Sequence, residues 1–304
     1  MSVSIRRVIK YLFHDRAQFC DSFVRNCLKF LPDKIYLSLR FRFNMGYWMS
    51  WDKPTRFSEK MQWLKVYNRK PEYTTLVDKY AVKEYVGKLI GQEYIIPTIG
   101  VWEQVDDIEW DILPNSFVLK TTHGGGSCGV VICRDKKKFD ILEAKAKLRE
   151  SLHSDIYNIL REWPYKNVRK RIIAEEFLIP GGLQYDLQDY KFFCFEGKPL
   201  YCQVIANRSQ VMTVDFYNEK WEHQDFHEPK TTHFAKGSQD SPLQLKLMLD
   251  LATILSNNHK FLRVDFYEVN NKVYFGELTF YPTSGFGGFD PESWDEYFGS
   301  LINL

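Results

Sequence analysis

The sequence predicts a mixed α+β fold, and two hairpin patterns and two helical patterns support this prediction. Residues 263–279 alternate as two strands around a polar turn, and residues 116–133 read as a strand, a glycine loop and a strand. Residues 58–68 and 75–89 carry apolar side chains at helical spacing. At 304 residues the chain is long enough for a large core and for two or three subdomains.

The first fifty residues combine aromatic and basic side chains, and they favour one or two amphipathic helices. The simpler interpretation is an ordinary helix packed on its own domain. The alternative is a helix on an anionic membrane surface, because basic and aromatic helices also bind there. The segment Arg40-Phe41-Arg42-Phe43, together with Trp48 and Trp51, is a candidate sugar-stacking or docking surface.

Two helices and a strand are expected next. Helical spacing covers residues 58–68 and 75–89, and Pro71 and Gly91 mark breaks in the pattern. Residues 94–101 read as a strand that leads into the glycine-loop region.

The glycine loop has the composition of a phosphate-binding flap. A short apolar strand ends in Lys120, and residues 121–129 contain Gly124-Gly125-Gly126 before a second strand. Glycines let backbone amides approach phosphate oxygens, and a lysine adds a point charge. This is not a P-loop, because no Gly-Lys-Ser/Thr follows and the next element reads as a strand. A plain hairpin turn is the alternative, and His123 is either a flap anchor or a phosphate ligand.

A third motif lies downstream of the flap. Residues 171–178 form a strand that ends in Glu175-Glu176-Phe177-Leu178, a hinge-like segment follows, and Asp189 begins another strand. Adenine needs backbone donors and acceptors beside apolar walls, and a ribose needs a carboxylate for its hydroxyls. Residues 175–178 and Asp189 have these properties.

The remaining regular elements are expected from periodicity and turn residues. Residues 139–160 should be mainly helical. In residues 241–258, alternating leucines favour a strand, but Ser241 as N-cap, Pro242 at the first helical position and a run of eighteen residues favour a helix, which we choose. Strands are expected near 168–177, 190–196, 199–206 and 212–217.

The hairpin at residues 263–279 is a candidate site for a divalent metal. Arg263 and Asp265 share one strand face, and Glu277 and Thr279 share another, because side chains two residues apart point the same way. Carboxylate oxygens are what Mg²⁺ prefers, and its remaining positions are usually filled by water and phosphates. A solvated edge hairpin with an ordinary charged face is the alternative.

The segment 283–289 follows this hairpin and is rich in glycine. It is either part of an acceptor pocket, with Ser284 and Gly285 offering an oxyanion-type contact, or a simple loop before the last helix.

Taken in order, these motifs resemble the ATP-grasp superfamily, although Glu-x-Thr stands where the superfamily usually has Glu-x-Asn. The resemblance is specific to the TupA-like branch, which is associated with bacterial surface-polysaccharide and teichuronopeptide synthesis, and it covers about Lys53 to the C-terminus. The segments that carry it are Asp78–Val82, Phe117–Thr121, Asp189–Phe193 and Gly276–Pro282.

The resemblance implies an ATP-grasp fold, in which two α+β subdomains clasp ATP, here preceded by a mostly helical N-terminal region. The implied divisions are a helical region at 1–70, a pre-ATP-grasp segment at 71–116, a small flap subdomain at 117–178 and a large metal-binding subdomain at 179–304.

The resemblance also assigns site residues. Lys120 would contact the α- and β-phosphates and the glycine flap would cover them. Arg263 would steady the transferred phosphate. The cofactor-binding set would be Lys120, His123, Gly124, Gly125, Gly126, Glu175, Glu176, Phe177, Leu178, Asp189 and Lys191. The metal ligands would be Asp265, Glu277 and Thr279, and the threonine at the last position puts firm binding of one metal in doubt.

The implied activity is an ATP- and Mg²⁺-dependent ligase that joins a carboxylate to an amine through an acyl phosphate during cell-surface polysaccharide assembly. The substrates would be small molecules or glycans that carry these groups. Three alternatives stay open: a phosphotransferase, a glycosyltransferase acting on a surface glycan, and a catalytically inactive ATP-grasp scaffold.

Bulk properties narrow the partners and the compartment. A net charge of +2 gives no footprint for nucleic acid. Six cysteines without Cys-x-x-Cys spacing indicate reduced thiols, and neither a secretory signal nor an 18-residue apolar run is present. We expect a cytoplasmic protein; its N-terminal region would contact the inner face of the membrane if the substrate is a lipid-linked glycan.

Overall fold

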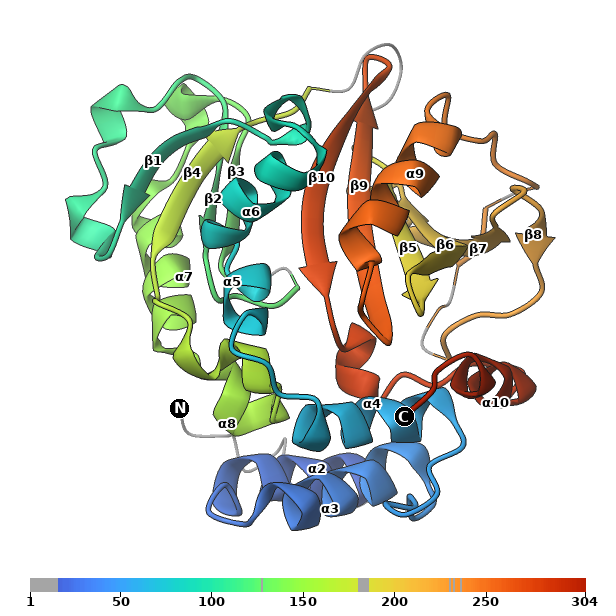
Figure 1. Cartoon of the computed structure of the whole chain (residues 1–304). Helices are drawn as coiled ribbons and strands as arrows, with labels where there is room; N and C mark the ends of the chain where they lie inside the picture. Colours follow the sequence, from blue (N-terminus) through green and yellow to red (C-terminus); the bar gives the residue numbers. More distant parts are fainter. Residues whose placement is uncertain (1–15, 127, 180–185, 230, 232, 236) are drawn as a thin grey trace.

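The computed structural model describes residues 16–304 except 127, 180–185, 230, 232 and 236. Two antiparallel sheets stand side by side, and helices close their lower end (Figure 1). The smaller sheet has the order β1-β4-β2-β3, with β1 (Thr98–Trp102), β2 (Phe117–Thr121), β3 (Val130–Cys133) and β4 (Ile172–Glu176). The predicted mixed α+β fold is confirmed.

The larger sheet has the order β10-β9-β5-β6-β7-β8. Its strands confirm those expected after residue 189 and the 263–279 hairpin. They are β5 (Asp189–Phe195), β6 (Lys198–Ala206), β7 (Thr213–Asn218), β8 (His223–Gln224), β9 (Phe261–Val269) and β10 (Lys272–Thr279).

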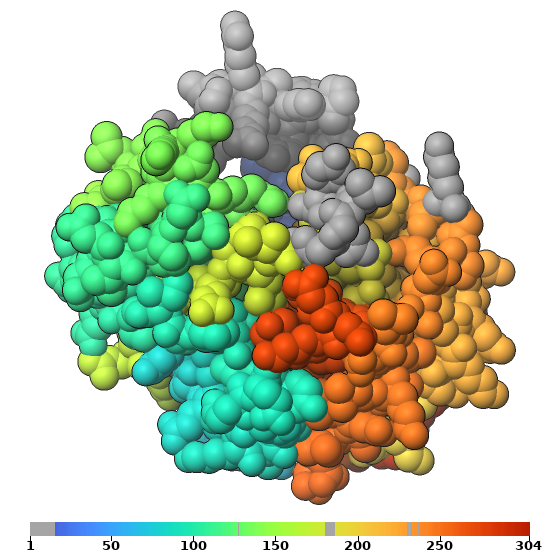
Figure 2. Space-filling view, turned by 90° about the horizontal axis from the view of Figure 1, so that it is seen from above, coloured from blue at the N-terminus to red at the C-terminus, as the bar shows by residue number. Residues whose placement is uncertain are grey.

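The two sheets meet at the end where the β9–β10 hairpin turns. Ile95 forms an isolated β-bridge with Phe275, and Ile96, Leu178 and Val269 pack together as a small buried cluster. Figure 2 looks down on this end and shows the hairpin against segments of the smaller-sheet half. Apolar side chains therefore join the two halves of the molecule at this end.

The helices follow the predicted periodicity with shifts at their ends. Those in the first third of the chain are α2 (Arg16–Cys27), α3 (Asp33–Met45), α4 (Phe57–Tyr67), α5 (Tyr73–Val77) and α6 (Ala81–Ile90). Those that follow are α7 (Ile141–His153), α8 (Ile156–Leu160), α9 (Leu245–Ser256) and α10 (Ser293–Ser300).

The helix expected over residues 75–89 is divided into α5 and α6. Asp78 causes the break, because its Oδ1 accepts hydrogen bonds from the backbone amides of Tyr80 at 2.9 Å and Ala81 at 3.2 Å. A carboxylate in this position satisfies amides that a new helix start leaves without partners.

Helix α9 resolves the conflict at residues 241–258 in favour of a helix, but it begins at Leu245 rather than at Pro242. Met248, Leu251, Ala252 and Leu255 are buried, which is the spacing of one helix face, whereas Leu243 is 81% exposed. The alternation of leucines thus reflects composition rather than a strand.

Helices α2 and α3 share a small core with Met49 and Phe286 at the lower end of the molecule (Figure 1). Phe41 is fully buried in this core, and the Arg40 guanidinium is buried in an ion pair with Asp21 at 2.7 Å. The interpretation of Arg40-Phe41 as a surface for sugar stacking was therefore wrong, although Trp48 is 62% exposed. The apolar residues predicted for a helix before Arg16 lie outside the described residues.

The His259 ring packs against the rings of Tyr73 and Phe280, with centroid distances of 5.5 and 5.6 Å. Burial, reinforced by Lys70, lowers the pKa of His259 to about 4 from 6.5. A lowered folded-state pKa means that the unfolded chain binds the proton more readily between these values, so this contribution to stability is present above pH 6.5 and is lost as the pH falls toward 4.

Replacing His259 by phenylalanine should remove this pH dependence while keeping the ring packing. We expect the free energy of unfolding of the parent, relative to His259→Phe, to fall by about 2 kcal/mol between pH 8 and pH 5. Urea denaturation at both values measures it. If the two proteins differ in free energy of unfolding by the same amount at pH 8 and pH 5, the pKa of His259 is not lowered by folding.

Candidate active site

The β9–β10 hairpin holds both predicted acidic metal ligands on one face because of a bulge. Phe275 pairs with Phe266, and then Glu277 pairs with Asp265, so Gly276 is the extra residue. A one-residue shift moves side chains to the other face of a strand, and without the bulge Glu277 would not lie opposite Asp265. A side chain at position 276 would crowd the Asp265 carbonyl oxygen, which lies 3.1 Å from the place of a Cβ.

Arg263 ties these groups into one cluster. Its Nε and Nη2 donate to the two carboxylate oxygens of Asp265, each at 2.7 Å, and Nη2 also reaches Glu277 Oε1 at 3.1 Å. The same Nη2 lies 3.0 Å from Thr279 Oγ1. Burial alone would lower the pKa of Arg263, but Asp265 and Glu277 outweigh it and raise that pKa above its usual range. The guanidinium is thus a permanent positive charge at this site.

Two lysines complete the charge balance of the cluster. Lys191 lies opposite Asp265 in the β5–β9 register and donates to its Oδ2, and Lys79 donates to Glu277 Oε2 at 2.8 Å. Partial burial would raise the pKa of Glu277, but Lys79, Lys191 and Arg263 lower it well below its usual range. Glu277 is therefore ionised at any working pH.

The oxygen donors fit a hard divalent cation. Asp265 and Glu277 supply carboxylate oxygens, and Thr279 Oγ1 lies 3.4 Å from Glu277 Oε1, so a third oxygen is at hand. Among the described residues no group of three or more His, Cys, Asp or Glu side chains is placed to hold a metal. Such a sparse set suits Mg²⁺, which takes one or two carboxylates and completes its shell with water and phosphates.

A second charged cluster lies on the smaller sheet. Glu175 of β4 is buried, and its two oxygens form ion pairs with Lys120 of β2 and with Lys83 of α6, both at 2.5 Å. Burial would raise the pKa of Glu175, but Lys120 and Lys83 outweigh burial and lower it. Glu175 therefore positions the Lys120 ammonium, and Lys83 shares the charge of the carboxylate.

The glycine loop starts from a fixed base. His123 is buried, and because its Nε2 lies 3.1 Å from the Ser151 carbonyl oxygen at the end of α7, that nitrogen is the donor. Burial lowers the pKa of His123. These contacts place His123 as an anchor at the base of the loop. Gly124 is also buried, whereas Gly125 and Gly126 are exposed.

The residues predicted to bind adenine and ribose lie where β4 ends and β5 begins. Glu176 is exposed, Phe177 is half-buried and Leu178 is buried. Asp189 is buried in β5, where it accepts from Arg208 at 2.7 Å and lies 3.3 Å from Lys191. Pro180 to Gly182 of the predicted hinge lie outside the described residues.

Lys79 and Lys83 are the residues that sequence reasoning missed. Lys79 links the β9–β10 cluster to the base of the glycine loop, because its backbone amide donates to the Thr122 carbonyl oxygen at 2.9 Å while its side chain binds Glu277. The segment Asp78–Val82 carries the family resemblance, but the sequence alone assigns no role to its lysine. Lys83 carried no signal beyond its place one helical turn later.

Comparisons with known proteins identify the family of this chain. The family described as TupA-like ATPgrasp matches residues 59–303. No curated protein matches the chain. Among solved structures, the D-alanine–D-alanine ligase of Helicobacter pylori is similar at 15% identity and a TM-score of 0.44, over 82% of this chain and 70% of that chain.

Two further solved structures are similar at low identity. The D-alanine–D-alanine ligase of Bacillus anthracis complexed with ATP shares 15% identity at a TM-score of 0.38, over 67% of this chain and 53% of that chain. The ATP-grasp ligase PsnB, complexed with its minimal precursor, Mg and ADP, shares 9% identity at a TM-score of 0.36. The match covers 87% of this chain and 66% of that chain. The family match spans most of the chain, and it confirms the predicted ATP-grasp fold: this chain belongs to the TupA-like ATP-grasp family.

Proposed function

We propose that the protein is an ATP- and Mg²⁺-dependent ligase that joins a carboxylate to an amine through an acyl phosphate, during the assembly of a bacterial cell-surface polysaccharide. One observation carries the proposal. Asp265 and Glu277 stand side by side in the sheet, ringed by Arg263, Lys79 and Lys191. This is an arrangement for polyanionic phosphates and a hard cation.

The reaction has two balanced steps. A substrate carboxylate oxygen attacks the γ-phosphorus of ATP, and ADP leaves. An amine nitrogen then attacks the acyl carbon, the phosphate leaves, and the nitrogen gives up a proton. When bound, Mg²⁺ would be held by Asp265 and Glu277, with Thr279 beside them, and would neutralise phosphate charge.

Each residue has a defined task in these steps. Lys120 holds phosphate oxygens, with its ammonium positioned by Glu175. Arg263 neutralises charge on the phosphoryl group as it is transferred. The glycine loop covers the site, because an acyl phosphate exposed to water would hydrolyse. Backbone groups of residues 176–178 hold adenine, and Asp189 with Lys191 serves the ribose side.

The experiment is ADP release with Mg-ATP against panels of sugar acids and amino acids, with mass spectrometry of the products. We expect ADP and an amide only when a carboxylate and an amine are both present. A phosphorylated product that persists with amine would indicate a phosphotransferase. Turnover of a nucleotide-sugar without ATP would indicate a glycosyltransferase, and no ADP release with any mixture would indicate an inactive scaffold.

Membrane contact through α2 and α3 is a further part of this proposal. No helix in the described ranges is long and apolar enough to cross a bilayer. Phe23, Phe30 and Ile35 are 50%, 78% and 51% exposed, and residues 16–45 hold six basic and two acidic side chains. Such a surface suits peripheral binding to anionic lipids.

We expect the protein to float with liposomes that contain anionic lipid, and not with neutral ones. Phe30→Ser combined with Phe23→Ser should reduce the bound fraction severalfold, because each ring contributes apolar burial. Leu142→Ser, at a residue 79% exposed on α7, is the matched control. Absence of flotation by the parent protein would remove membrane contact from the proposal.

A further inference from the structure

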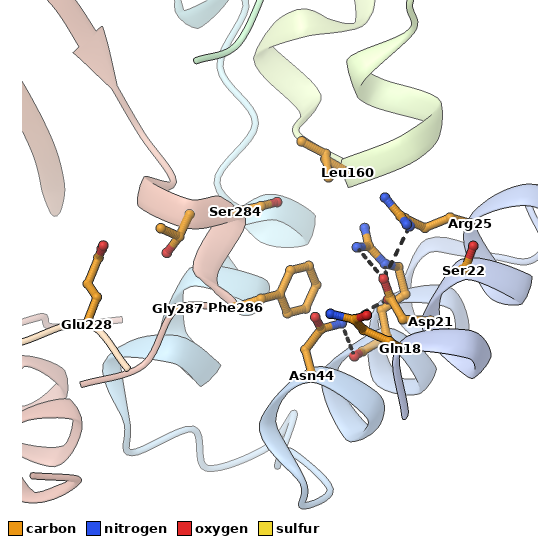
Figure 3. A pocket seen from close by; sticks show the side chains of 12 residues that line it. Gln18, Asp21, Ser22, Arg25, Asn44, Leu160, Glu228, Ser284, Phe286 and Gly287 are labelled. Carbon is orange, nitrogen blue, oxygen red and sulfur yellow. Dashed lines mark hydrogen bonds and ion pairs between the residues drawn. The ribbon is translucent and has the colours of Figure 1, made fainter. Parts of the chain in front are cut away.

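A pocket of about 420 Å³ lies between the N-terminal helices and the turn that follows β10 (Figure 3). Asp21, Arg25 and Asn44 line it from α2 and α3, and Ser284 and Phe286 line it from the turn. Its volume is in the range of small-molecule sites. We propose that this pocket is the binding site for the carboxylate substrate, and that its substrate is a hydroxyl-rich sugar acid.

The pocket adjoins the proposed reaction centre along the chain. Thr279 is 3.0 Å from Arg263, and Thr283, a pocket residue, comes four residues later. Four residues span at most about 14 Å, which limits how far the pocket wall can lie from this cluster. Glu228 lines the pocket on the side away from α2 and α3 (Figure 3), and its negative charge is close enough to act on Arg263.

The turn that forms one wall is held in a strained shape. Thr283 and Ser284 have φ values of 47° and 55°, a left-handed conformation that non-glycine residues rarely adopt. The buried Lys65 ammonium donates to the carbonyl and hydroxyl oxygens of Ser284, both at 2.8 Å. Gln62 donates to the carbonyl oxygens of Ser284 and Gly285, both at 3.0 Å. Strain that surrounding contacts enforce in this way is typical of ligand sites.

The pocket wall formed by α2 and α3 is also held in place by hydrogen bonds and ion pairs. Asp21 accepts from Arg40 at 2.7 Å and from Asn44 at 2.8 Å, and the Arg40 guanidinium lies 4.8 Å from the Phe286 ring centroid. Arg25 is 3.2 Å from Asp21, but its side chain stays 43% exposed. Arg25 is thus a cation at the rim of an otherwise preorganised surface.

The lining defines the class of ligand. Amides from Gln18 and Asn44 and hydroxyls from Ser22, Thr283 and Ser284 face the cavity alongside charged groups of both signs. Such a set hydrogen-bonds several hydroxyls, and a guanidinium pairs with a carboxylate. Leu160 and Phe286 are the large apolar side chains of the lining. A uronic acid or a short glycan that carries one has the matching chemistry.

This inference rests on the proposed function, but direct binding tests it separately. Calorimetry with glucuronic acid and galacturonic acid, without ATP, compares the parent with Arg25→Gln and with the pocket-filling Ser22→Phe. We expect each variant to weaken uronic acid binding about tenfold or more, because a charged hydrogen bond or the ligand volume is lost. Their ATP affinity and thermal unfolding midpoint should not change.

Arg16→Gln is the matched control, because Arg16 lies on the same helix but does not line the pocket. It should bind like the parent. Equal binding by the parent, Arg25→Gln and Ser22→Phe, or no binding of uronic acids by the parent, would overturn the inference. Binding of amino acids in place of uronic acids would overturn the substrate class. If uronic acids bind but no mixture releases ADP, the proposed ligase activity fails, and the pocket remains a binding site for sugar acids without being a substrate site.

Discussion

Replacing Glu277 by glutamine is expected to slow ADP release by about 10²–10³-fold, the scale of losing one electrostatic group in an active site. Glutamine keeps the size of the side chain and one oxygen, but it removes the charge that would hold a divalent cation beside Asp265. Steady-state ADP release at saturating Mg-ATP measures the loss.

Glu150→Gln is the control for this experiment, because Glu150 is an exposed acid on α7 outside both charged clusters. It should turn over like the parent. The thermal unfolding midpoint separates lost chemistry from lost folding, since Lys79 and Arg263 would each lose an ionic partner. Parental turnover by a folded Glu277→Gln protein would show that the metal site is wrongly placed.

The second large effect is expected for Lys120→Ala, which should lower kcat/KM for ATP by about 10²-fold or more. The substitution removes a positive charge from the phosphates. The fold should survive, because Glu175 keeps its ion pair with Lys83 at 2.5 Å and its buried charge stays compensated.

Lys88→Ala provides the comparison, since Lys88 is an exposed lysine on α6 whose partner is Glu84. Initial rates across a range of ATP concentrations give kcat and KM for both variants. If Lys120→Ala keeps the parental kcat/KM, the flap-side lysine does not touch the phosphates.

Much of the fold and of the candidate site was predictable because it depends on local pattern. The 263–279 hairpin alternates visibly, and Lys120 stands at the end of an apolar strand before glycines. Resemblance to the family then placed these motifs in one site. Glu175 and Asp189 were proposed because they stand near a strand end and at a strand start, and Lys191 was proposed from the resemblance alone.

What escaped prediction depends on contacts between distant segments. The bulge at Gly276 is set by pairing with β9, and nothing in the alternation of residues announces it. Lys83 and Glu175 are 92 positions apart in the sequence, and Lys79 and Glu277 are 198 positions apart. We predicted that this helix begins at Pro242, because Ser241 and Pro242 are favourable residues for a helix start. In the structure α9 begins at Leu245 instead.

The cations that surround Asp265 and Glu277 have a consequence for how metal and nucleotide would bind there. Lys79, Lys191 and Arg263 already neutralise these acids, so a bare Mg²⁺ ion would have to compete with three covalently tethered charges. Phosphates offer the lysines and the arginine another anionic partner, which frees carboxylate oxygens for the metal. We therefore expect nucleotide and metal to be linked ligands, each raising the affinity of the other by the same factor. Because the Lys79 amide also holds the base of the glycine loop, that linkage extends to the element that shields the reaction from water.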